Sequence, residues 1–254
     1  MATTTALRAS PATRSSRTGL IVVALLSLAI ALVSLQRYAQ GSVTEIAAAG
    51  GDGAAIAQAF TNAPAAVQVA LYVHIAGGAV ALLAGPSQFS RRLRNRARTL
   101  HRALGRVYFG AVALAALAAL VIAPWNSAGL VGVLGFGSLG VLWLWTGALA
   151  LRAIRRRDVE VHQAWMIRNY ALTFAAPTLR LWLVLLITAQ VASSGGVLDP
   201  ELAFSRAYVV VPFLCWVPNL VVAEWLIRRR GLPALGRRWG AAARHPTDVV
   251  ARSS

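Results

Sequence analysis

Six long, mostly apolar stretches divide this chain and constrain its fold more than any other feature. They lie at residues 19–35, 65–85, 107–123, 128–151, 165–191 and 207–227. Each stretch has the length with which an α-helix crosses the roughly 30 Å hydrocarbon core of a bilayer. Because 57% of all residues are hydrophobic and only 13% are charged, a soluble fold could not bury them all. The sequence therefore predicts an all-α, polytopic membrane helix bundle with six transmembrane helices.

The distribution of arginine predicts the orientation of this bundle. All 25 basic residues are arginine, and they gather before the first span, between spans two and three, after span four and after span six. The opposite loops carry acids instead, namely Glu45, Asp52, Asp199 and Glu201. Since short basic loops stay in the cytoplasm, both termini are expected there. The predicted domains are a basic N-terminus at 1–18, a transmembrane domain at 19–230 and a basic cytoplasmic tail at 231–254.

The net charge of +17 is therefore a topology signal and an attraction to anionic lipid headgroups, and it does not indicate nucleic-acid binding. Cys215 is the only cysteine, which excludes an internal disulfide and a thiolate metal cage within this chain. Small residues at Gly77, Ala81 and Gly85 predict close helix packing. Glu224 is expected to form an ion pair with Arg168, because an unpaired charge in a bilayer is costly.

A polar stripe on the fifth span indicates an interior site. Its members recur at steps of three or four residues and are His162, Met166, Asn169, Thr173, Ala176 and Arg180. Pro177 predicts a kink beside Arg180. His74 of the second span is expected at a similar depth, where the pair could bind a quinone or a small anionic ligand.

Two histidines predict a second, cofactor-binding site. His101 and His162 both stand at the cytoplasmic start of a span, where two imidazoles from different helices suit a b-type haem. Arg102 and Arg106 are expected to hold the haem propionates, and Gly105 to leave room for the ring. Three alternatives stay open: histidines that bond only to backbone or headgroups, a non-haem metal, and a ligand without metal.

Blocks of these residues resemble one family, the predicted bacterial membrane proteins grouped as domain of unknown function 2306 (DUF2306). The residues that carry the resemblance are His74, Gly77, Gly85, Pro86, Gln88, Arg94, His101, Arg102, Gly105, Arg106, Tyr108, His162, Trp165, Met166, Arg168, Asn169 and Arg180. The resemblance covers about Val67 to Val191. It implies a multi-pass protein of the bacterial plasma membrane and no established activity. The bundle histidines are also similar in kind to those of the membrane ferric reductases, which carry more paired histidines within their spans.

Three functions are consistent with these patterns. The first is a membrane redox protein with a single haem b. The second is a transporter or a receptor for a small anion, and the third is a non-catalytic assembly subunit. No pattern in the sequence predicts a catalytic residue.

Overall fold

A computed structural model describes residues 11–50 and 54–235, which form helices joined by short turns and contain no strand. The elements are α1 (Pro11–Gln40), α2 (Val43–Ala49), α3 (Ala54–Gln58), α4 (Ala65–Gln88), α5 (Arg91–Arg96), α6 (Arg98–Ile122), the 3-10 turn η1 (Ala123–Trp125), α7 (Gly129–Arg155), α8 (Val159–Thr173), α9 (Ala175–Ser193), α10 (Pro200–Leu214) and α11 (Val217–Arg229). Residues 1–10 and 236–254 of the predicted basic termini, and with them His245, lie outside the described residues, as does Asp52.

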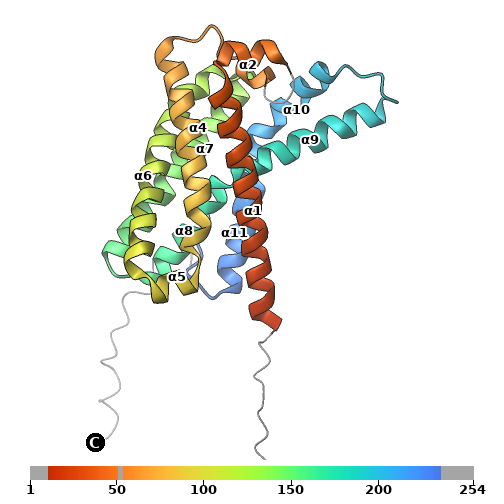
Figure 1. Cartoon of the computed structure of the whole chain (residues 1–254). Helices are drawn as coiled ribbons and strands as arrows, with labels where there is room; N and C mark the ends of the chain where they lie inside the picture. Colours follow the sequence, from red (N-terminus) through yellow and green to blue (C-terminus); the bar gives the residue numbers. More distant parts are fainter. Residues whose placement is uncertain (1–10, 51–53, 236–254) are drawn as a thin grey trace, which may run out of the picture.

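The predicted all-α fold with six spans is confirmed. Six stretches are long and apolar enough to cross a membrane, at 18–40, 65–88, 98–125, 129–155, 175–193 and 201–229. At one end of the bundle lie α5, the start of α6, the end of α7, the start of α8 and the end of α11, at the bottom of Figure 1. We call this the basic end, because most of the arginines of the described residues gather there.

The bundle centres on α4, α6, α7 and α8, with α1 packed along α4 (Figure 1). The small residues of α4 allow this packing. A Cβ on Gly77 would lie 3.0 Å from the Cβ of Ala115 on α6, and Ala81 is fully buried. Gly85 lies beneath the ring of Tyr170, which fills the space that a side chain there would need. The predicted close approach along this stripe is confirmed.

The fifth and sixth spans are both broken, whereas only a kink at Pro177 was expected within 165–191 and an unbroken helix at 207–227. The fifth divides into α8 and α9 at Phe174, and the sixth into α10 and α11 at Cys215 and Trp216. A proline lies just after each break, Pro177 and Pro218, and removes one amide from the helical ladder. Figure 1 shows the result: α9 leaves the bundle at a steep angle, and α10 returns alongside it.

Polar side chains tie the two breaks together. The Thr178 hydroxyl donates to the Cys215 carbonyl at 2.5 Å, and the Asn219 amide donates to the Ala171 carbonyl at 3.1 Å. The same amide group lies 3.0 Å from the Cys215 carbonyl and 3.0 Å from Thr178 Oγ1. Backbone carbonyls freed inside a membrane need such partners, since no water is there to bond them. The breaks are therefore capped and held at one level.

Replacing Gly85 by alanine should destabilise the protein by about 1–3 kcal/mol, because the new methyl group overlaps the Tyr170 ring. Gly78→Ala on the same helix is the matched control, since no atom lies within 4 Å of its Cβ position. Thermal unfolding of both variants in detergent measures the difference. Equal stability of the two variants would contradict the packing described for α4.

Replacing Asn219 by alanine should cost about 1–2 kcal/mol, because the Ala171 carbonyl loses its side-chain donor and the Cys215 carbonyl keeps only the Thr178 hydroxyl. Asn95→Ala is the matched control. It removes the same type of side chain from the exposed face of α5, where the amide makes no hydrogen bond with any described residue. The midpoints of thermal unfolding should fall for the first variant only. A fall of the same size in both would show that the break does not depend on Asn219.

Candidate functional site

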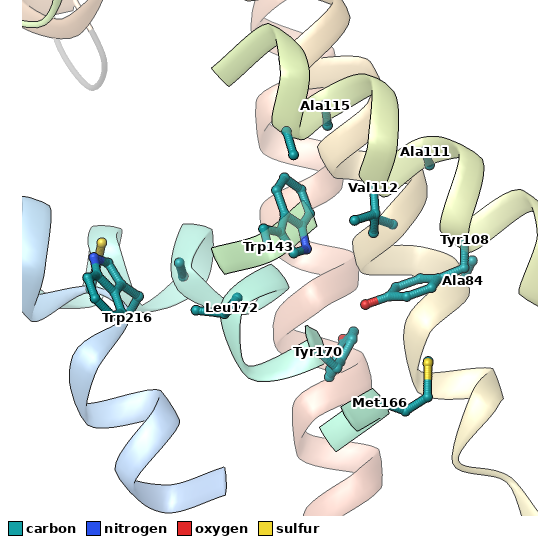
Figure 2. Close-up of a cluster of buried hydrophobic side chains, with 14 of the residues drawn as sticks. Ala84, Tyr108, Ala111, Val112, Ala115, Trp143, Met166, Tyr170, Leu172 and Trp216 are labelled. Atoms are coloured by element: carbon teal, nitrogen blue, oxygen red, sulfur yellow. The ribbon is translucent and has the colours of Figure 1, made fainter. Parts of the chain in front are cut away.

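A buried hydrogen-bond network fixes α6, α7 and α8 relative to one another. Tyr108 is fully buried and reaches from α6 into the bundle interior, as Figure 2 shows. Its hydroxyl donates to Asn169 Oδ1 at 2.6 Å and lies 2.9 Å from Thr173 Oγ1. From α7, the Trp143 indole donates to Thr173 Oγ1, and the Asn169 amide donates to Thr146 Oγ1. Each of these polar groups is bonded, so the network holds helices together and offers no open site.

This network sets the register that brings His101 and His162 together. Helices α6 and α8 both run away from the basic end, and Tyr108 meets Asn169 directly across the gap between them. Counting back seven residues from each partner reaches His101 and His162. Seven residues are close to two turns, about 10 Å along each axis, so both histidines return to the facing sides of their helices at one depth. The Tyr108 to Asn169 bond is consistent with the predicted common depth of the two histidines.

The surroundings of the two imidazoles differ. His162 donates from Nδ1 to the Ala150 carbonyl of α7 at 2.8 Å, since a carbonyl can only accept. Its Nε2 is then the free, unprotonated nitrogen of the neutral ring. His101 Nδ1 is buried and has no hydrogen-bond partner among the described residues. The charges of Arg94 and Arg102 act on His101, which makes this position electropositive.

The groups expected around a haem are present in part. Arg102 and Arg106 are exposed at the basic end, while Arg94 of α5 is half-buried beside His101. Sequence reasoning did not include Arg94 in the site, because nothing in an arginine-rich loop shows which arginine turns inward. The space expected at Gly105 is filled by Gln88, whose Oε1 lies 3.2 Å from the Cβ position of that glycine.

His74 and Arg180, expected to face each other, bond to different elements. The His74 ring donates from Nδ1 to the Ala115 carbonyl of α6 at 2.9 Å and meets the Trp143 ring edge to face. Arg180 donates to Ser34 Oγ of α1 at 2.8 Å and to the Ala176 carbonyl of its own helix. His74 thus belongs to the α4, α6 and α7 side of the bundle, and Arg180 joins α9 to α1.

The ion pair expected between Arg168 and Glu224 is confirmed. Two guanidinium nitrogens of Arg168 donate to the two carboxylate oxygens at 2.5 and 3.1 Å, and the Trp165 ring covers the guanidinium at 4.5 Å. Arg168 is only 3% exposed, so its charge depends on this one carboxylate. The pair joins α8 to α11 below the break in each span.

The model of one protein family, described as a predicted membrane protein (DUF2306), matches residues 71–227. The chain belongs to the DUF2306 family. The matched part of this DUF2306 protein runs from α4 to α11 and contains all the site residues named above. No curated protein and no solved structure matches the chain.

Across residues 11–50 and 54–235, no three His, Cys, Asp or Glu side chains gather into a group that could hold a metal ion. A metal held by His101 and His162 would therefore have no third protein ligand from that part of the chain.

Changing Glu224 to glutamine should destabilise the protein by about 3 kcal/mol, because Arg168 would keep a buried charge without a counter-ion. Glu160→Gln, an exposed glutamate on the same α8 as Arg168, is the charge-matched control. The double variant Arg168→Met with Glu224→Leu should recover much of the loss in thermal unfolding. If the Glu224→Gln variant is as stable as wild type, the ion pair does not hold α11 in place.

Proposed function

We propose that this protein is a membrane redox protein that binds one b-type haem between His101 and His162. The observation that carries the proposal is the common register of the two histidines on parallel helices, fixed by the Tyr108 to Asn169 hydrogen bond. When bound, haem supplies one-electron transfer through its iron. Two axial histidines from facing helices are a frequent arrangement for haem in helix bundles.

The choice of haem over a bare metal rests on the number of ligands. Structural and catalytic zinc sites use at least three protein ligands, whereas haem needs only its two axial ones. His162 is also prepared as a ligand, because the Ala150 carbonyl fixes the ring and its tautomer and leaves Nε2 with its lone pair. His101, with a buried and unbonded Nδ1, has ring nitrogens available for the same role.

The remaining groups fit the acidic edge and the flat ring of such a cofactor. Arg94, Arg102 and Arg106 supply positive charge for propionates at the basic end. Gln88 occupies the space over Gly105 and would have to turn away. Within the described residues its amide donates only to Ser87 Oγ, at 3.1 Å, in the last turn of α4, so little holds it in place.

The same proposal includes where electrons enter and leave. The arginine-rich loops favour a bacterial inner membrane with the basic end and both termini in the cytoplasm. A cytoplasmic donor would then reach the histidine pair directly. A quinone within the bilayer is the acceptor class that suits His74, whose ring is fixed by the Ala115 carbonyl.

A second candidate function, transport of a small anion, is favoured by a separate observation. Broken helices that meet at one level are typical of transporter binding sites, and here α8, α9, α10 and α11 meet in that way. Arg180 lies in the second turn of α9, just beyond the break. The spectra described next discriminate the two, because an anion site requires no coloured cofactor.

Absorption spectra of the detergent-purified protein, oxidised and then reduced with dithionite, test the haem proposal. We expect a Soret band and a reduced alpha band in wild type, and at least a tenfold loss of bound haem in His101→Ala and in His162→Ala. His74→Ala is the control and should keep both bands. A colourless wild type, produced with haem in supply, or bands that persist in both ligand variants, would overturn the proposal.

A further inference from the structure

Three arginines at the basic end of α7 surround a hollow that the proposed redox site does not use. The hollow has a volume of about 430 Å³ and is lined by Arg152, Arg155, Arg156, Ala148 and Leu151. Counted from Ala148, the other four positions follow at three, four, seven and eight residues, so all five share one helical face. One side of the hollow is therefore cationic and the other apolar.

The three guanidinium groups have no partner in the part of the chain that the structure describes. None of the three guanidinium groups makes a hydrogen bond or an ion pair with any described residue. The one salt bridge among the described residues joins Arg168 to Glu224. Asp158, the nearest acid in sequence, is used as the cap of α8 and accepts from the Val161 amide at 3.1 Å. Three unpaired cations so close together repel one another, and one anion would relieve that repulsion.

The same face of α7 continues into the membrane as an apolar and aromatic surface. Trp145 lies seven residues before Arg152, about 10 Å deeper, and is 60% exposed. Leu151 and Ala148 lie between the tryptophan and the arginines. Because α7 is a membrane span, this exposed face meets lipid.

We infer that this face of α7 binds an anionic phospholipid, with the phosphate at Arg152, Arg155 and Arg156 and an acyl chain along Leu151, Ala148 and Trp145. Arginine suits the phosphate because its planar group donates two parallel hydrogen bonds. A free phosphate ion shares the headgroup chemistry but leaves the apolar wall and Trp145 without a role. Basic pockets on the cytoplasmic side of membrane spans commonly bind such headgroups.

Quenching of tryptophan fluorescence by brominated acyl chains tests this assignment in the full-length protein. The protein has eight tryptophans, so the Trp145 signal is taken as the difference between wild type and Trp145→Phe. In detergent micelles, brominated phosphatidylglycerol should quench this signal at least twofold more strongly than brominated phosphatidylcholine. The excess should vanish in the triple variant Arg152→Gln, Arg155→Gln, Arg156→Gln.

A second triple variant, Arg91→Gln, Arg92→Gln, Arg96→Gln, removes the same charge from exposed positions of α5 and should retain the excess. Inorganic phosphate at a large molar excess over the lipid should not abolish it. Equal quenching by the two lipids, an equal loss in both triple variants, or full displacement by inorganic phosphate would each overturn the inference. If the α7 variant fails to fold, the comparison of the two lipids on wild type still decides it.

Discussion

The structure depends first on the hydrogen bond between Tyr108 and Asn169. Helices α6 and α8, which carry these two residues, make few backbone contacts with each other. Side-chain contacts therefore determine how far the two helices are shifted along their axes. Thr173, Trp143 and Thr146 complete the bonding, and every donor within this group finds an acceptor. In a bilayer, where apolar surface does not drive helices together, such bonds and close van der Waals contact supply much of the specificity. His101 and His162 each lie two turns before a partner in this contact, so the contact sets where they stand along their helices.

Much of this architecture could be predicted from the sequence because the bilayer limits the choices. The length of each apolar stretch, the small residues of α4 and the pairing of Arg168 with Glu224 all follow from the cost of exposing backbone, polar atoms or charge to lipid. Each of these features is local, or joins residues whose depth can be counted from the ends of their spans.

The rest was not predictable because it depends on contacts between distant segments. A hydropathy pattern is the same for a continuous helix and for one divided at Phe174, so only the kink at Pro177 was expected, not the departure of α9 from the bundle. The same limit applies to the site. Gly105 predicts space, but whether Gln88 of another helix fills that space depends on packing that no spacing rule contains. Nor does any spacing rule show that Tyr108 holds the helices in register.

The paired breaks divide the membrane domain into a bundle and a hairpin formed by α9 and α10. The chain leaves the bundle after α8 and re-enters it at α11, and the Arg168 to Glu224 ion pair joins these two helices below the breaks. The hairpin of α9 and α10 is consequently fastened at its base and inclined away from the bundle (Figure 1). An inclined apolar hairpin spans less bilayer thickness than an upright one, and tilt is the usual means by which helices adapt to that thickness. The Arg180 to Ser34 hydrogen bond to α1 and the packing of α10 on α7 hold this inclination, so the hairpin crosses the bilayer at a different tilt from the helices that carry the histidines.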